Sequence, residues 1–242
     1  MRVSGEGEPL LLIHGGVNRD ETWRAQEPLA ERWRLLLPAR RGFPPSPAAE
    51  RQNFEADAHD IVALLAEQPA HCVGFSYGGV GLAVAASIDA SNIRSMTLIE
   101  PALFSVALER PEVQELMELA AAALGEDPEA RERARESFEE LARVRFPGNP
   151  QQEQAFLEAR RLAPGLRQPG EARPDLEAIA AVGVPALIVS GDHHPAMEAV
   201  CDVLAERLGG ERAHLPGRGH AVQRAPAFND VLERFLRSAA DR

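Results

Sequence analysis

Apolar and polar positions alternate in a regular order along the 242-residue chain. Short, continuous apolar runs recur, and such runs are typical of strands buried on both faces of a parallel sheet. Between them lie stretches whose apolar residues return at helical spacing, so the order indicates parallel βαβ units with helices on both faces of one sheet. The pattern predicts strands at 9–13, 33–38, 70–75, 93–99, 184–189 and 211–215, and helices at 21–32, 53–68, 80–86, 176–182, 195–208 and 225–238.

One segment interrupts this alternation. From residue 104 to residue 173 the chain is rich in charge and helical in pattern, and it carries no strand signal. An insertion that interrupts a sheet without adding a strand to it is expected to form a lid or cap. We therefore predict an α/β core of residues 1–103 and 174–242 and an all-helical cap of residues 104–173. Helices are predicted within the cap at 111–124, 128–145 and 150–162.

The strongest chemical motif is Gly74-Phe75-Ser76-Tyr77-Gly78, which lies between a predicted strand and a predicted helix. Glycines two residues to either side of a serine allow a sharp strand-to-helix turn, and this turn pushes the serine hydroxyl out toward solvent. The spacing alone is a weak signal, but the strand before it and the helix after it strengthen it. Ser76 is therefore the candidate nucleophile.

A serine nucleophile needs a base to take its proton and an acid to orient that base. His220 lies in a glycine-rich loop between the last predicted strand and the last helix, where its imidazole can reach over the sheet edge. Asp192 follows the strand before that and is the predicted acid, whereas Glu100, at the end of the preceding strand, is the alternative. Because the carboxyl ends of parallel strands meet at one edge, all of these side chains can converge on Ser76.

A tetrahedral intermediate also needs hydrogen-bond donors for its oxyanion. One donor is expected to be the backbone N–H of Tyr77, the residue after the nucleophile. The other is expected from His14-Gly15-Gly16, where the glycines let the backbone approach the substrate, and we assign it to Gly16. His14 itself is expected to hydrogen-bond within this loop.

Composition narrows the range of functions. The formal net charge of −11 disfavours nucleic acid and anionic membranes as partners. All 26 basic residues are arginine, which excludes mechanisms that need a catalytic or phosphate-binding lysine. The two cysteines, Cys72 and Cys201, lack metal-ligand spacing, and no metal site is predicted. Because no apolar run approaches the roughly 20 residues of a membrane span and the N-terminus lacks a signal-like core, we expect a cytoplasmic enzyme.

The order of these motifs resembles the α/β-hydrolase fold superfamily, in particular its small members with a helical cap, and the resemblance covers essentially the whole chain. It implies a doubly wound, mostly parallel sheet. It also implies that Ser76 is the nucleophile, His220 the base and Asp192 the acid, with the backbone N–H groups of Gly16 and Tyr77 forming the oxyanion hole.

The chain departs from the family pattern in two places. Relatives commonly carry Asp-x-Arg-Gly-x-Gly-x-Ser after the second core strand, whereas residues 39–46 here read Ala-Arg-Arg-Gly-Phe-Pro-Pro-Ser. This difference is expected to change how the loop is supported and to leave the catalytic roles intact. The segment before residue 9 is short, so one or two leading strands of the full fold are expected to be missing.

A Ser-His-Asp set with an oxyanion hole supports acyl transfer to water through an acyl-enzyme. We expect a hydrolase of carboxylic esters with small or medium acyl groups, lactones included, that uses no metal or organic cofactor and is a monomer or homodimer. Cofactor-free perhydrolysis and carbon–carbon bond hydrolysis are alternatives on the same residues, and a non-catalytic small-molecule receptor is a third. Candidate residues for the pocket wall, for which core packing is the alternative role, are Phe104, Leu116, Phe138 and Phe156.

Overall fold

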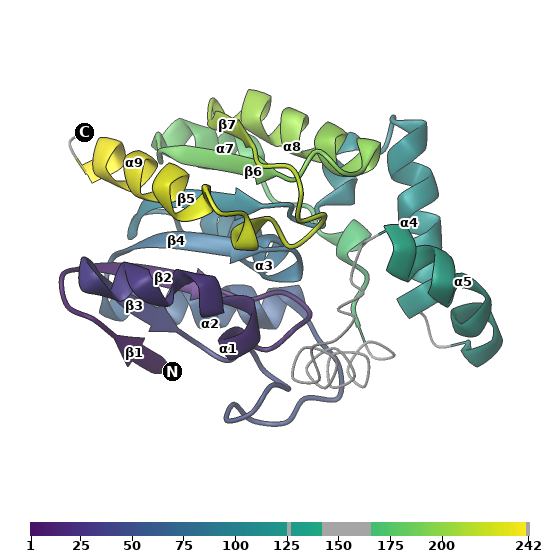
Figure 1. Ribbon diagram of the computed structural model, residues 1–242, viewed down its shortest axis with the longest axis horizontal. Coiled ribbons are helices and arrows are strands. Elements are labelled where there is room, and N and C mark those ends of the chain that lie inside the picture. The colour runs from purple at the N-terminus through teal and green to yellow at the C-terminus, as the bar shows by residue number, and fades with distance from the viewer. Residues whose placement is uncertain (125–126, 142–165, 241–242) are drawn as a thin grey trace.

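The computed structural model describes residues 1–124, 127–141 and 166–240. Within them, seven strands form one sheet in the order β1-β3-β2-β4-β5-β6-β7 (Figure 1). Every neighbouring pair is parallel except β1 with β3. The predicted doubly wound, mostly parallel sheet is therefore confirmed. The strands are β1 Arg2–Ser4, β2 Glu8–Ile13, β3 Trp33–Leu37, β4 Ala70–Phe75, β5 Ile93–Ile99, β6 Ala186–Ser190 and β7 Glu211–His214.

Helices cover both faces of this sheet. Figure 1 shows α9 and α1 on the near face and α3 behind the strands. The α-helices are α1 Arg19–Thr22, α2 Phe54–Glu67, α3 Tyr77–Ile88, α4 Pro111–Leu124, α5 Pro128–Leu141, α7 Leu176–Val182, α8 Pro195–Leu208 and α9 Phe228–Ala240. Short 3-10 helices are η1 Arg24–Glu31, η2 Phe104–Ala107, η4 Pro169–Glu171 and η5 Val222–Arg224.

Two apolar cores account for the continuous apolar runs of the strands. Successive residues of a strand point to opposite faces, so Cys72 of β4 joins one core and Val73 joins the other. The first core packs α2, α3, α7 and α8 against the sheet, and the second packs η1 and α9 against the opposite face. Because both faces are covered, every residue of β4 is buried.

Two details of the N-terminal part differ from the sequence prediction. A short leading strand, β1, was not predicted, and it pairs antiparallel with β3 at the sheet edge. The helix predicted at 21–32 is instead the single turn α1 followed by the 3-10 helix η1, which contains Pro28. Proline lacks the backbone N–H of a regular helix and clashes with the preceding turn, which explains the interruption.

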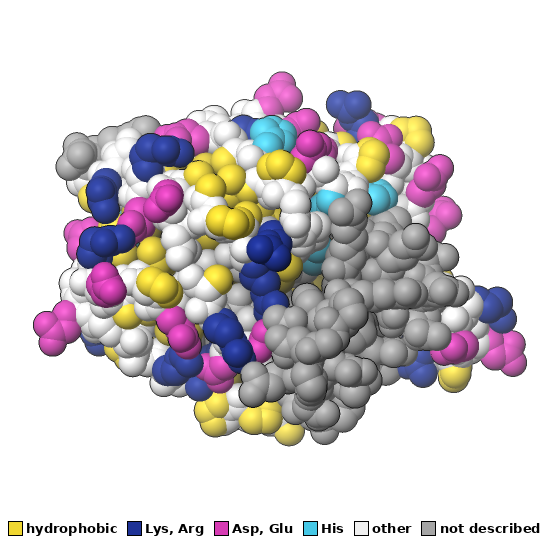
Figure 2. Space-filling view, in the orientation of Figure 1, with side chains coloured by type: hydrophobic (Ala, Val, Ile, Leu, Met, Phe, Trp, Pro, Cys, Tyr) yellow, Lys and Arg dark blue, Asp and Glu magenta, His cyan; other side chains and the backbone are white. Residues whose placement is uncertain are grey.

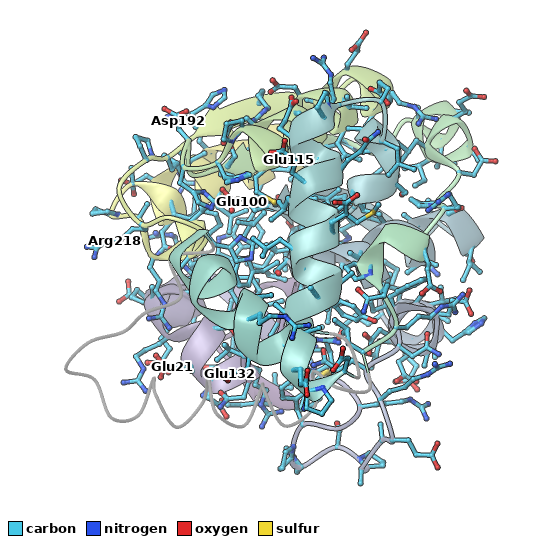
Figure 3. The ribbon with its side chains drawn as sticks, turned by 90° about the vertical axis from the view of Figure 1, so that its right-hand side faces the viewer. Glu21, Glu100, Glu115, Glu132, Asp192 and Arg218 are labelled. Atoms are coloured by element: carbon cyan, nitrogen blue, oxygen red, sulfur yellow. The ribbon has the colours of Figure 1, made fainter. Side chains whose placement is uncertain are left out.

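The segment 104–173 contains helices and no strand among its described residues. Helix α4 contacts α8 of the core and η2 at the start of this segment, and α5 packs on α4. Figure 1 shows α4 and α5 beside one edge of the sheet, and Figure 3, seen from that side, shows α4 in front of the region that contains Glu100. The helix predicted at 150–162 lies outside the described residues. We propose that 104–173 is a cap over this edge.

The described surface carries both signs of charge. Figure 2 shows arginine side chains interspersed with acidic ones over one face, with small apolar patches between them. Among the described helices, none is long and apolar enough to cross a membrane.

Candidate active site

Ser76 occupies the sharp turn between β4 and α3, with φ 52° and ψ −122°. A positive φ in a residue other than glycine is strained by about 1–3 kcal/mol and is typical of functional turns. The flanking glycines allow the turn, since a Cβ on Gly74 would lie 2.7 Å from the Cα of Gly79. A Cβ on Gly78 would overlap the carbonyl oxygen of His14. The backbone therefore packs closely on both sides of Ser76 and holds the hydroxyl at the sheet edge.

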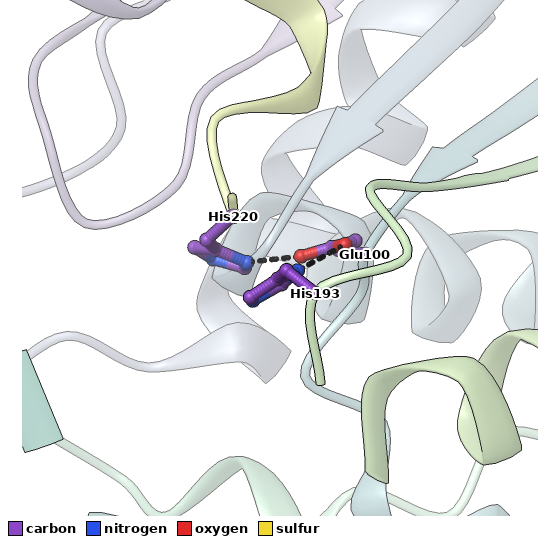
Figure 4. A group of neighbouring side chains, drawn as sticks. All are labelled: Glu100, His193 and His220. Atoms are coloured by element: carbon purple, nitrogen blue, oxygen red, sulfur yellow. Dashed lines mark hydrogen bonds and ion pairs between the residues drawn. The ribbon is translucent and has the colours of Figure 1, made fainter. Parts of the chain in front are cut away.

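His220 connects Ser76 to a buried carboxylate. Its Nε2 lies 3.0 Å from Ser76 Oγ, and its Nδ1 lies 2.6 Å from Glu100 Oε2 (Figure 4). Since the ionised carboxylate can only accept, Nδ1 carries the proton and Nε2 is free to accept the serine proton. Residues up to 144 positions apart in sequence thus form one chain of hydrogen bonds, Ser76–His220–Glu100.

The structure differs from the sequence prediction at the acid. Asp192 follows β6 as expected, but its side chain is exposed and its backbone N–H donates to Glu198 Oε1 at 3.0 Å. Figure 3 shows Asp192 at the outside of the molecule and Glu100 further in. Strands β5 and β6 pair in parallel, so both residues reach the same edge. It is Glu100, directly after β5, whose carboxylate turns inward to His220.

The environment of Glu100 keeps its carboxylate charged. The side chain is fully buried, and Oε1 accepts the backbone N–H of Gly191 at 2.7 Å. Burial alone would raise the pKa of Glu100, but its interactions with His193 and His220 outweigh burial and lower the pKa to about 2. At neutral pH the carboxylate is therefore ionised and able to stabilise a protonated His220.

Glu100, His193 and His220 also have the composition of a metal site. Their ligand-type atoms all lie within 4.8 Å of one another. Zinc ligands at about 2.0–2.1 Å in a tetrahedral site lie roughly 3.3 Å apart. The 2.6 Å between His220 and Glu100 is shorter and typical of a charge-assisted hydrogen bond. We therefore interpret the group as two histidines arranged around one carboxylate, and not as a metal site.

The loop after β2 places two glycines beside Ser76. A Cβ on Gly15 would lie 2.9 Å from the Cβ of Ser76, so this position requires glycine. Apart from its chain neighbours, no atom of the described residues lies within 4 Å of the position that a Cβ on Gly16 would occupy. As far as the described residues go, this side of Gly16 is therefore open.

Both ring nitrogens of His14 make hydrogen bonds that support this loop. Its Nδ1 lies 2.7 Å from the carbonyl oxygen of Val17, and its Nε2 accepts the backbone N–H of Arg40 at 2.9 Å. Burial, and after it the charge of Arg40, lowers the pKa of His14 to about 3. The imidazole is therefore neutral, with both nitrogens engaged, and is not available as a base for Ser76.

The side chain of Arg40 is buried beneath the same loop. It donates from Nη1 to the carbonyl oxygen of Gly15 at 2.6 Å, from Nε to Asp57 at 2.9 Å and from Nη2 to Gln52 at 2.8 Å. The carbonyl of Gly15 and the N–H of Gly16 belong to one planar peptide unit and point in opposite directions. By holding the carbonyl on the buried side, Arg40 turns the N–H of Gly16 to the other side.

Tyr77 begins helix α3, so its backbone N–H is one of the first-turn donors that a helix leaves without an internal partner. The single proton of its hydroxyl is shared between the carbonyl oxygens of Arg167 at 3.0 Å and Gln52 at 3.3 Å. The ring lies 4.8 Å from the guanidinium of Arg40. The Tyr77 side chain is thus engaged in packing, and burial raises its pKa well above the ordinary value.

Comparison with known proteins identifies the family of this site. The model of the alpha/beta hydrolase family matches residues 10–230. The chain belongs to the alpha/beta hydrolase family. A comparison with curated proteins gave no match.

Solved structures of other alpha/beta hydrolases have the same fold at low sequence identity. At such identities the similarity shows a shared fold and nothing about substrate. An N-acyl homoserine lactonase complexed with N-hexanoyl homoserine is 20% identical, with a TM-score of 0.73 over 98% of this chain and 92% of that chain. A thermophilic esterase from Thermogutta terrifontis is 20% identical, with a TM-score of 0.72 over 98% and 92%. A meta-cleavage product hydrolase from Pseudomonas fluorescens is 21% identical, with a TM-score of 0.61 over 98% and 93%.

The structure describes the side chains of two of the four predicted pocket residues of this alpha/beta hydrolase. Phe104 on η2 and Leu116 on α4 are buried and belong to the first apolar core. This is the packing role that the sequence left open as an alternative. Phe138 lies on α5 with a side chain that the structure does not describe, and Phe156 lies outside the described residues.

Sequence reasoning missed two residues of the site. Arg40 lies in the segment that departs from the family pattern, and that departure was the available signal for altered loop support. His193 follows the predicted acid directly, and the pair His193-His194 after a predicted strand is the feature of the sequence that points to it.

Proposed function

We propose that this alpha/beta hydrolase cleaves carboxylic esters, lactones included, through an acyl-enzyme on Ser76. The observation that carries the proposal is the unbroken hydrogen-bond chain from Ser76 through His220 to the buried carboxylate of Glu100. This arrangement of a nucleophile, a base and an orienting acid is what nucleophilic acyl transfer requires.

In the first half of the proposed reaction, Ser76 Oγ attacks the ester carbonyl while His220 Nε2 accepts the hydroxyl proton. The positive charge that develops on the imidazole lies 2.6 Å from the ionised Glu100. The tetrahedral intermediate then collapses, His220 returns the proton to the leaving alkoxide, and the alcohol departs. For a lactone, the alcohol is the other end of the same molecule.

The oxyanion of the intermediate would be bound by the backbone N–H groups of Gly16 and Tyr77. Support for Gly16 comes from the orientation of its peptide unit, whose carbonyl end is held by Arg40. Support for Tyr77 comes from its position in the first turn of α3, where an N–H has no internal acceptor and the helix dipole favours negative charge. Two fixed donors of this kind cost no reorganisation as the charge develops.

In the second half, a water molecule replaces the alcohol. His220 takes a proton from the water as it attacks the acyl-enzyme, and the collapse of the second intermediate returns that proton to Ser76 Oγ and releases the carboxylic acid. Every proton moves between Ser76, His220, substrate and water. This route needs no metal or organic cofactor.

Turnover by purified protein tests the proposal. The parent and Ser76→Ala are compared on p-nitrophenyl esters of increasing acyl length, on acyl lactones and on a vinylogous diketone. We expect Ser76-dependent hydrolysis of esters or lactones. Hydrolysis of the diketone alone would instead support carbon–carbon bond cleavage, and addition of hydrogen peroxide to the ester assay detects perhydrolysis. A rate unchanged by Ser76→Ala, or no turnover of any substrate, would contradict the proposal and leave the receptor alternative.

A further inference from the structure

The loop after β6, residues 191–194, occupies the place where the sequence predicted the acid. Its first residue, Gly191, donates its N–H to Glu100 Oε1. A Cβ on Gly191 would overlap the carbonyl oxygen of Gly219, so the loop fits tightly between Glu100 and the loop that carries His220. In this protein the β6 loop thus contacts the acid instead of supplying it.

The far side of the same loop is anchored by Glu198 of α8. This carboxylate accepts the hydroxyl of Ser190 at 2.6 Å through Oε2 and the N–H of Asp192 at 3.0 Å through Oε1. Arg212 of β7 donates to the same Oε2 at 2.7 Å. These contacts hold Asp192, and with it the next residue of the loop, and none of them involves Ser76, His220 or Glu100.

That residue is His193, and its side chain is turned inward. The side chain is only 3% exposed, and its Nδ1 lies 3.1 Å from Glu100 Oε1, the oxygen that does not bind His220 (Figure 4). This contact has the distance of an ion pair but is not among the hydrogen bonds of the structure, and the buried Nδ1 has no hydrogen-bond partner among the described residues. A buried imidazole nitrogen with one carboxylate oxygen in reach is stabilised only if it carries a proton and faces that oxygen.

We propose that His193 is a positioning residue that binds Glu100 Oε1 through its Nδ1–H and so keeps Oε2 directed at His220. The inference rests on the proposed function, since it concerns the same acid. Glu100 then has three donors: the backbone of Gly191 and the rings of two histidines that approach its two oxygens from different loops.

A third donor changes the chemistry of Glu100 as well as its orientation. Each hydrogen bond to a carboxylate withdraws negative charge from it, so without His193 the carboxylate would be more basic and would hold the Nδ1 proton of His220 more strongly. A protonated His220 cannot act as a base, so activity would then begin at a higher pH. Other titratable or charged groups near this loop are Asp192 and His194 within it, Glu198 of α8 and Arg212 of β7 beside it, and Glu115 of α4, which interacts with His194.

Two substitutions at one position separate this role from mere packing. His193→Leu removes the donor, and His193→Asn keeps an N–H near the position of Nδ1. His194→Asn is the matched control, because His194 caps α8 by accepting the N–H of Ala196, and asparagine caps helices equally well. If the leucine variant does not fold, His193→Ala removes the same donor without added bulk.

The first readout needs no substrate. It is the proton NMR resonance of the His220 Nδ1–H that is bonded to Glu100. We expect this resonance to move to lower field in His193→Leu and to stay at the parent position in His193→Asn and His194→Asn. An unmoved resonance in His193→Leu, or a His193→Asn variant that behaves like the leucine variant, would overturn the inference.

The second readout is the pH dependence of ester hydrolysis. In His193→Leu we expect kcat to fall about tenfold or more with KM unchanged. The acidic limb should move to higher pH by roughly half a unit or more. If kcat falls but the acidic limb of the pH profile stays at the same pH, the inference is overturned. If the Ser76→Ala variant hydrolyses esters at the parent rate, the proposed function is contradicted instead. The NMR resonance of the His220 Nδ1–H would then still decide the role of His193.

Discussion

At the scale of single residues, three positions at the carboxyl edge of the sheet share an unusual backbone. Ser76, Glu100 and Asp192 have φ values of 52°, 37° and 50°, and each follows a different, neighbouring strand. Positive φ turns the chain abruptly at a strand end and sets the direction of the side chain. Glu100 and Asp192 share a positive φ, yet Glu100 points inward to His220 and Asp192 lies in solvent, so this torsion alone does not decide which carboxylate turns inward.

The assignment of the acid gives a direct prediction. Glu100→Gln should lower kcat by about 10⁴-fold, the scale of the corresponding change in a serine protease, because the amide cannot stabilise an imidazolium. Asp192→Asn is the matched control, and asparagine tolerates its positive φ. We expect Asp192→Asn to keep the parent kcat in an ester assay. The reverse outcome, an inactive Asp192→Asn beside an active Glu100→Gln, would return the acid to the β6 loop.

The nucleophile and the base could be proposed from the sequence because each has a local signal. Ser76 lies between two glycines at a strand–helix junction, and His220 lies in a glycine-rich loop before the last helix. The choice between Glu100 and Asp192 had no such signal, since both follow parallel strands that are neighbours in the sheet. Which carboxylate turns inward depends on backbone torsions and on contacts that no spacing encodes.

At the scale of elements, the loop after β3 shows how a departure from a family pattern becomes structure. Arg40 is buried against Asp57 of α2, and both side chains are under 5% exposed. Burial, the largest effect, raises the pKa of Asp57, whereas Arg40 opposes that rise. The pair therefore depends on both partners, and through Gly15 it also holds the peptide that would bind the oxyanion.

Removal of Arg40 should affect stability and rate together. Arg40→Met leaves Asp57 buried without its cation, which is expected to cost about 3–5 kcal/mol in the free energy of unfolding. It also frees the Gly15 carbonyl, so kcat should fall. Arg41→Met is the control, because Arg41 pairs with Asp60 on the exposed surface. Urea unfolding and ester turnover measure the two effects, and an unchanged kcat in folded Arg40→Met would show that Arg40 does not position the peptide.

Most elements could be predicted because their signals are local. The helices α4, α7 and α8 and the strand β5 have the predicted bounds, and two of these helices have a clear start at Pro111 or Pro195. The strand β1 could not be predicted, since three residues that are partly or fully exposed give no apolar pattern. Its place depends on pairing with β3, which is a tertiary contact.

At the scale of the whole molecule, buried histidines couple stability to pH. Burial and Arg40 lower the pKa of His14 from an ordinary value of 6.5 to about 3. Between these values the unfolded chain binds a proton that the folded chain does not, so the free energy of unfolding falls as pH falls. Glu100 acts in the same direction at lower pH, because its pKa of about 2 lies below the ordinary 4.5.

Urea unfolding between pH 7.5 and pH 4.5 tests this coupling. The unfolding midpoint of the parent should fall steadily below pH 6.5, since each unit of pKa difference is worth about 1.4 kcal/mol. His14→Asn should be less stable at pH 7.5 but have a shallower dependence on pH. Part of the slope should remain, because burial also lowers the pKa values of His71 and His194. A parent midpoint that is constant across this range would contradict the account.

The measurement that tests the central claim most directly is covalent labelling of Ser76 by a fluorophosphonate. Such a reagent phosphonylates a serine that has an active base, whatever the natural substrate is. We predict that intact-protein mass spectrometry will show one added label on the parent, that peptide mapping will place it on Ser76, and that His220→Ala will label far more slowly. Parent protein that stays unlabelled, or a label carried on another residue, would contradict the claim that Ser76 is an activated nucleophile.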